Sequence, residues 1–206
     1  MTFSKNDIDR LSIEVGNRMS TRRFAHTLGV VKMAERLASL CLPNKSDELV
    51  CAAYLHDVTK ELSYQEHIEL INKGGLLLDG EDLNTEAILH SFSASYVIKR
   101  DFPTFATVDI LSAVYNHTIG SPDMSVFDEI IFLSDFIEET RSYNASIELR
   151  NFVFERMLDG DIDNNVRVLH EACVISIDKT VLHLIEEKRA INSKNILTRN
   201  ALLGKI

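Results

Sequence analysis

Six side chains that bind transition metals interrupt otherwise apolar, helix-forming segments of the sequence. They are His26, His56, Asp57, His90, His117 and Asp135. Burying a polar group costs roughly 2–7 kcal/mol unless it is paired or bound to a metal. Asp135, inside the apolar run 130–137, is therefore the most informative of the set. A single histidine on such a helix is usually a hydrogen-bonded core residue, but the conjunction of all six predicts one metal centre.

Imidazole and carboxylate ligands together suit iron, manganese or zinc. Asp57 has two oxygens and can bridge two ions. The other ligands then divide between a first ion (His26, His56 and Asp135) and a second (His90 and His117). A metal pair about 3.5–4 Å apart can lower the pKa of a bridging water towards roughly 7, which gives a hydroxide placed for attack on phosphorus.

Helices must position these ligands, because the sequence has no alternating strand pattern of useful length. Adjacent His56 and Asp57 cannot share one face of an ideal helix, so we place them at a helix C-terminus, where both can reach a common site. Ser63-Tyr64-Gln65-Glu66 has the form of a capping box that starts another helix. The predicted helices of this all-α fold span residues 5–19, 22–42, 46–57, 63–73, 83–100, 104–117, 125–140, 145–158 and 163–190.

Composition narrows the class of function. The chain has 206 residues, 45% of them apolar, which allows a single domain with its own core. Its net charge of −9 argues against binding nucleic acid or an anionic membrane, so any phosphate substrate must meet local positive charge. We find no signal peptide and no transmembrane run, and expect a cytoplasmic protein. The three scattered cysteines predict buried thiols.

Five separated motifs carry a resemblance to a known family. They are Arg23-x-x-His26-x-x-Gly29-Val30, His56-Asp57-x-x-Lys60, His90 followed by Ala94, His117-Thr118-x-Gly120, and Ser134-Asp135-Phe136-Ile137-Glu138 followed by Arg141. Over roughly residues 20–145 this order resembles the HD-domain metal-dependent phosphohydrolases, and among them the YqeK family of symmetrical bis(5'-nucleosyl)-tetraphosphatases. The chain departs from that pattern at Ser91 and Ser93, where the family usually has glycines, and at Glu139, where it usually has proline.

The resemblance implies a single HD-type helical bundle over residues 1–206, with a core of about 20–145 and a C-terminal helical extension of about 146–206. It also implies a hydrolase that cuts diadenosine tetraphosphate in the middle to give two ADP. Two metal ions would assist, with iron implied and manganese, zinc, cobalt or nickel also compatible with the ligands.

Four further residues lie near the ligands in sequence. Lys60 would contact a phosphate oxygen or protonate the leaving group, although a lysine is also common at a helix C-terminus. Arg23 would reach the substrate phosphates or orient a carboxylate. Arg141 would close over the substrate or pair with Glu138, and Thr118 would form a rim of the pocket.

Other functions stay open at this point. The same metal core could serve a nucleotidase or a cyclic-nucleotide phosphodiesterase, because a fold does not fix its substrate. The chain could also be a helical sensor that binds a nucleotide without turning it over. In each case the expected partner is a small-molecule nucleotide, with neither nucleic acid nor membrane bound, and a homodimer is left open.

Overall fold

The computed structural model describes residues 3–206, and every regular element in that range is a helix. The α-helices are α1 Lys5–Gly16, α2 Thr21–Cys41, α3 Ser46–Leu55, α4 Tyr64–Lys73, α5 Gly80–Leu83, α6 Leu89–Asp101, α7 Val108–Asn116, α8 Val126–Ile137, α9 Asn144–Arg156, α10 Ile162–Glu186 and α11 Ser193–Leu203. Short 3-10 helices occupy Pro43–Lys45, Glu86–Ile88 and Pro103–Phe105. The predicted all-α fold is confirmed.

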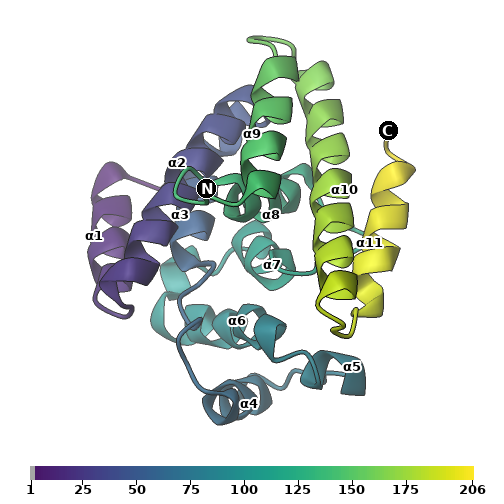
Figure 1. Cartoon of the computed structure of the whole chain (residues 1–206). Coiled ribbons are helices and arrows are strands. Elements are labelled where there is room, and N and C mark those ends of the chain that lie inside the picture. The colour runs from purple at the N-terminus through teal and green to yellow at the C-terminus, as the bar shows by residue number, and fades with distance from the viewer. Residues whose placement is uncertain (1–2) are drawn as a thin grey trace.

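A central group of helices carries the core. Helix α2 packs on α3 and α8, and α7 packs on α3, α6 and α8. Helix α10 runs along α8 with α9 and α11 beside it, while α4 lies against α6 at the opposite end of the molecule (Figure 1). The buried face of α8 is mostly apolar, with Ile130, Ile131 and Leu133 fully buried, and it also carries the buried polar residues Asp128, Glu129 and Ser134. Close packing of these helices holds polar side chains from different parts of the chain near one another.

Helix starts follow the local signals of the sequence. Ser63 caps α4 and forms the predicted capping box with Glu66, in which the Ser63 side chain accepts a hydrogen bond from the Glu66 backbone N–H. Ser125 and Asp128 form a second capping box at the start of α8. These reciprocal bonds satisfy N–H groups that a helix leaves without partners.

The predicted helix 83–100 is wrong in its first part. The chain instead forms α5, a 3-10 turn at Glu86–Ile88 and then α6, which begins at Leu89. Thr85 has φ −108° and ψ 74°, which is outside the helical region. Buried Asp82 accepts a hydrogen bond from the Asn192 side chain, a tertiary contact that the local pattern could not reveal.

Several predicted helix ends also need correction. Helix α8 ends at Ile137 rather than 140, because Glu138 has an extended backbone with φ −58° and ψ 153°. The predicted helix 104–117 begins only at Val108, after a 3-10 turn and the N-cap Thr107. The prediction missed α11 altogether, since that helix depends on contacts with α10 and on its buried Leu202.

Two further expectations can be compared with the structure. No helix among residues 3–206 is long and apolar enough to cross a membrane. The cysteines Cys41, Cys51 and Cys173 are free and buried, as predicted.

Candidate metal centre

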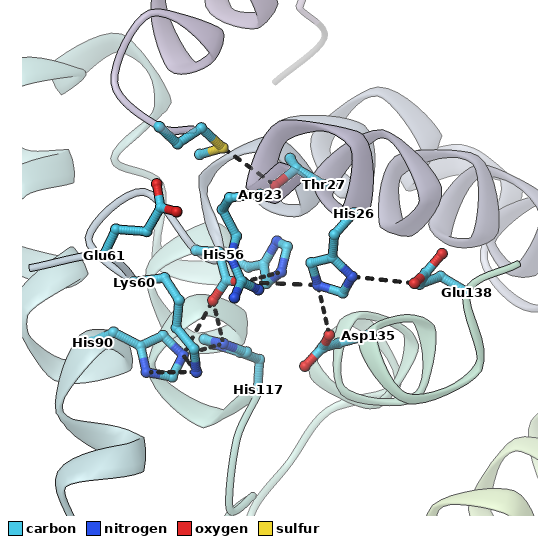
Figure 2. A network of polar contacts seen from close by, with 12 residues as sticks. Arg23, His26, Thr27, His56, Lys60, Glu61, His90, His117, Asp135 and Glu138 are labelled. Atoms are coloured by element: carbon cyan, nitrogen blue, oxygen red, sulfur yellow. Dashed lines mark hydrogen bonds and ion pairs between the residues drawn. The ribbon is translucent and has the colours of Figure 1, made fainter. Parts of the chain in front are cut away.

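The six predicted ligands converge in the core. His26 comes from α2, His56 and Asp57 from the end of α3, His90 from α6, His117 from the end of α7 and Asp135 from α8. Ligand atoms of His26, His56 and Asp135 lie within 4.8 Å of one another, as do those of His56, Asp57 and His117. Figure 2 shows the four imidazole rings turned towards a common space. Elements far apart in sequence therefore supply one cluster.

Asp57 lies in the middle of this cluster and is buried. Its Oδ2 lies 3.4 Å from His56 Nε2 and 3.7 Å from His26 Nε2. Its Oδ1 lies 3.2 Å from His90 Nε2 and 3.7 Å from His117 Nε2. The two oxygens of one carboxylate thus face two different sets of histidines. Burial opposes ionisation, but the neighbouring histidines hold the pKa of Asp57 well below its usual value.

Two of the histidines are oriented by the helices that end at them. His56 Nδ1 donates to the Ala53 carbonyl at 2.6 Å, and His117 Nδ1 donates to the Val114 carbonyl at 2.7 Å. Each histidine is the C-cap residue, so it satisfies a carbonyl that the last turn leaves free. With the proton on Nδ1, the Nε2 lone pair of a neutral ring points into the cluster, which is the arrangement of a metal-ligating histidine.

His26 is oriented by a carboxylate instead. Its Nδ1 donates to Glu138 Oε1 at 3.2 Å, and its Nε2 lies 3.0 Å from Asp135 Oδ1. Thr140 holds Glu138 in place, with its backbone N–H donating to Oε2 at 2.6 Å. Burial would lower the pKa of His26, but the hydrogen bonds to Asp135 and Glu138 outweigh burial and raise it to about 9.

Both predicted arginines contact ligand carboxylates. Arg23 Nη1 donates to Asp57 Oδ2 at 2.8 Å, which is the carboxylate-orienting alternative of the prediction. Arg141 donates through Nη2 to Asp135 Oδ1 at 2.5 Å and through Nε to the Asp135 carbonyl at 2.8 Å. Arg141 thus pairs with Asp135, and the Glu138 carboxylate instead accepts from His26 and Thr140. The two guanidinium groups offset the negative charge gathered at the cluster.

The other end of the cluster holds Lys60, His90 and His117. His90 Nε2 lies 3.0 Å from His117 Nε2, and Lys60 Nζ lies 3.2 Å from His90 Nε2 (Figure 2). Burial lowers the pKa of His90 to about 3, against the opposing effect of Asp57. Burial likewise lowers the pKa of Lys60. Both groups are therefore easier to deprotonate than they would be in water.

Ser91 and Ser93 occupy the positions where the YqeK family usually has glycines. Ser93 donates to Thr59 Oγ1 at 2.9 Å, and Thr59 donates to the His90 carbonyl at 2.8 Å. Ser91 accepts a hydrogen bond from Thr118 at 3.3 Å, which places Thr118 beside the start of α6. These serines are fully buried, so they fill the space with hydrogen-bonded side chains and keep α6 fixed behind His90.

The donor set fits a divalent transition metal. Within residues 3–206, the Nε2 atom of His56 is buried without a hydrogen-bond partner. Leaving such a nitrogen unpaired is costly unless another group binds it. Imidazole nitrogens combined with carboxylate oxygens are the ligands that such ions favour.

Two clefts reach the cluster from the surface. The arginine cleft, of about 480 Å³, is lined by Arg22, Arg23, His26, Glu61, Glu138 and Arg141, among others. The lysine cleft, of about 410 Å³, is lined by Lys60, Leu62, His67, Glu86, His90 and Arg189, among others. Both offer cationic side chains, which is the local positive charge that the acidic chain needs for a phosphate substrate.

Sequence reasoning missed two of these residues. Glu138 belongs to the fifth motif and is expected from sequence to pair with Arg141, although a carboxylate directly after an apolar helix is a signal of a buried role. Arg189 lies in the charged run 186–189, whose composition is typical of a solvated surface. No local feature distinguishes Arg189, and only the tertiary structure brings it into the cleft that Lys60 and His90 line.

Comparison with known proteins agrees with this geometry. The HD domain family model matches residues 23–178. The chain is 27% identical to the symmetrical bis(5'-nucleosyl)-tetraphosphatase of Bacillus subtilis strain 168, over 92% of this chain and 94% of that protein. It is 28% identical to the protein of the same name from Halalkalibacterium halodurans, over 90% and 91% respectively.

A solved structure is similar as well. It is the crystal structure of a predicted HD superfamily hydrolase involved in NAD metabolism from Clostridium acetobutylicum, which superposes with a TM-score of 0.82 at 27% identity over 100% of both chains. The family model, the relatives and the fold all agree. The chain therefore belongs to the HD domain family.

Proposed function

We propose that this protein hydrolyses dinucleoside polyphosphates, cutting diadenosine tetraphosphate symmetrically to two ADP in a metal-dependent reaction. The observation that carries the proposal is the position of Asp57, whose two oxygens face different histidines at 3.2–3.7 Å. Such a carboxylate can join two metal ions. The names of the relatives supply the substrate class and the symmetry of the cut.

HD membership and the His/Asp cluster together imply that divalent metal binds here. We propose two ions. Asp57 would be shared between a first set with His26, His56 and Asp135 and a second set with His90 and His117. When bound, the ions would act as Lewis acids that activate water and polarise a phosphoryl oxygen. We propose iron, with manganese, zinc, cobalt and nickel as the alternatives that this donor set also accepts.

The chain's own cations handle the phosphates. Lys60 and Arg189 share the lysine cleft, where they would offset charge on the substrate, and Lys60 would also donate a proton to the leaving phosphate oxygen. Burial of Lys60 lowers its pKa, which favours that donation. Arg23 and Arg141 line the arginine cleft and would contact phosphate oxygens there. Thr118, which follows His117 in the sequence, stays a predicted substrate contact at the rim of the pocket.

We also propose that the core and the C-terminal extension form one domain over residues 1–206. Helix α10 packs on α8, the helix that carries Asp135. The extension also supplies Arg189 to the lysine cleft. A cytoplasmic location stays a prediction from sequence. Whether the chain forms a homodimer stays open, and size-exclusion chromatography with light scattering would test it.

Product analysis tests the proposed function directly. The purified protein is assayed for metal by elemental analysis and incubated with diadenosine tetraphosphate, and the products are separated by chromatography. ADP alone is expected. ATP with AMP would contradict symmetrical cleavage, and phosphate released from mononucleotides would indicate a nucleotidase. Absence of turnover across a nucleotide panel, with nucleotide still bound, would favour a sensor.

A further inference from the structure

A third cleft begins at the metal centre and extends along helix α10. This apolar cleft, of about 660 Å³, is lined by Asp135, Phe136, Arg141, Tyr143, Leu182 and His183, among others. Asp135 belongs to the metal cluster, and Arg141 and Tyr143 also line the arginine cleft. The apolar cleft therefore adjoins both the cluster and the arginine cleft, within reach of a ligand whose phosphates lie at the cluster.

The walls of this cleft suit a flat aromatic group. Tyr143 is 68% exposed and Leu182 is 59% exposed, and both large side chains face the same space with the half-buried Phe136. They come from different elements, since Tyr143 precedes α9 and Leu182 lies on α10, which packs on α9 (Figure 1). Exposed aromatic and aliphatic side chains are the usual surfaces on which bases stack.

Polar groups stand at the margin of the apolar cleft. Lys179, Thr180, His183 and Glu186 follow one another along α10 and line it. Lys179 is held by Glu148, whose carboxylate accepts its hydrogen bond at 2.8 Å. An apolar wall with a few polar groups is typical of small-molecule sites, and the volume lies within their usual range of about 300–1,000 Å³.

The chemistry of the lining selects the occupant. Arg141 and the neighbouring metal cluster favour an anion, whereas Tyr143 and Leu182 favour an aromatic ring. We propose that the apolar cleft is a nucleoside subsite, which holds one base and ribose of the dinucleoside polyphosphate while its phosphates lie at the metal centre. This proposal rests on the proposed function for the identity of the ligand.

Two ligands that differ only in the nucleoside test this subsite. ADP and pyrophosphate are titrated into the metal-loaded protein by calorimetry, for the wild type and for Tyr143→Ala and Leu182→Ala. We expect each variant to weaken ADP binding by about tenfold, within the range measured for loss of base stacking. Pyrophosphate should bind each variant as it binds the wild type. Tyr143→Phe keeps the ring and should keep ADP affinity within about twofold.

Matched controls come from the same kinds of residue elsewhere. Ile185→Ala removes a 56% exposed aliphatic side chain from the same helix as Leu182, and Tyr64→Ala removes a 42% exposed tyrosine from α4. Both controls should bind ADP like the wild type. Because Tyr143 and Leu182 are exposed, their removal should leave the melting curve by circular dichroism unchanged.

The outcomes separate this proposal from the proposed function. Unchanged ADP affinity in both cleft variants would overturn the subsite, even if the wild type cuts diadenosine tetraphosphate. An equal loss for pyrophosphate would overturn it too, since the defect would then lie at the metal centre. A selective loss of ADP affinity supports the subsite. If that loss occurs in a protein that does not cut diadenosine tetraphosphate, the subsite stands and the proposed hydrolysis fails.

Discussion

The two ends of the metal cluster are built from different chemistry. The carboxylate side comprises His26, Asp135, Glu138 and Arg141, where one imidazole lies between two carboxylates. The imidazole side comprises Lys60, His90 and His117, where an ammonium and two imidazoles face each other and Asp57 is the carboxylate that contacts both imidazoles. Asp57 joins the two sides.

The difference shows in the protonation of the histidines. On the carboxylate side the pKa of His26 is raised to about 9 by Asp135 and Glu138, although burial opposes this. On the imidazole side burial lowers the pKa of His90 to about 3. A metal ion on the carboxylate side would displace the proton of His26, whereas the imidazole side offers the unprotonated His90 beside a lysine. We infer that the carboxylate side binds its metal more tightly, because its proposed set has two carboxylates and two histidines, whereas the imidazole side has only the shared Asp57 and two histidines.

The largest effect is expected from the residue that the two sides share. Asp57→Asn removes the charge of the carboxylate that faces both sets of histidines, so metal content should fall on both sides and hydrolysis of diadenosine tetraphosphate should drop by more than about 100-fold. Elemental analysis and product chromatography measure this. Asp47→Asn, an exposed change near the start of α3, serves as the control. Full metal content in Asp57→Asn would disprove the bridging role.

A second change separates the two sides. His117→Ala should cost about one equivalent of metal relative to the wild type and lower hydrolysis by roughly 100-fold, because it removes a ligand from the imidazole side alone. The reciprocal variant, Asp135→Ala, should weaken the carboxylate side, which we infer to be the tighter one. Elemental analysis after mild chelation compares them. Loss of all metal from His117→Ala would mean that the sides do not bind independently.

A third change tests whether Glu138 orients the imidazole of His26 on the carboxylate side. Glu138→Gln keeps an oxygen that can accept from His26 Nδ1 but removes the charge, so metal affinity should fall by about tenfold, at the low end for such supporting residues. Metal-binding titration of the stripped protein measures it. Glu139→Gln changes the adjacent, exposed glutamate and should have no effect. Equal affinities in the two variants would exclude an orienting role for Glu138.

The sequence predicted the residues that cluster in the core because each violates the apolar pattern around it. A buried polar side chain must be compensated, so Asp135 within 130–137 and His56-Asp57 after an apolar turn pointed to a common partner. The all-α class was predicted from the helical spacing of apolar residues, which is also a local pattern. Local patterns sufficed wherever the physical cause was local.

Tertiary contacts explain what the sequence did not reveal. Helix α11 packs against α10. The predicted helix 83–100 is interrupted before α6, and Asp82, just before the interruption, contacts Asn192 and Lys194. Glu138 leaves the helical conformation at the point where its carboxylate meets His26. Arg189 has the composition of an ordinary surface residue. In each case the deciding partner lies far away in the chain, where no local pattern can show it.

The smallest effect is expected from Arg189→Ala. This change tests whether a residue on the imidazole side can affect substrate binding without affecting metal binding. It follows Lys188, which has φ 53° at the end of α10, and its N–H donates to the Leu184 carbonyl at 2.9 Å. This helix end fixes Arg189 beside Lys60 in the lysine cleft. Because Arg189 is exposed, Arg189→Ala should raise the KM for diadenosine tetraphosphate by only about two- to fivefold, as for other exposed ion pairs.

Metal content and kcat of Arg189→Ala should match the wild type, since Arg189 lies beside the substrate path and is no ligand. Arg167→Ala, on α10 and paired with Glu171, removes the same charge from an exposed residue outside the clefts and should leave KM unchanged. Steady-state kinetics at two salt concentrations measure both variants, and the difference should shrink at high salt because an exposed charge is screened. A loss of metal in Arg189→Ala would show instead that the C-terminal segment stabilises the imidazole side itself.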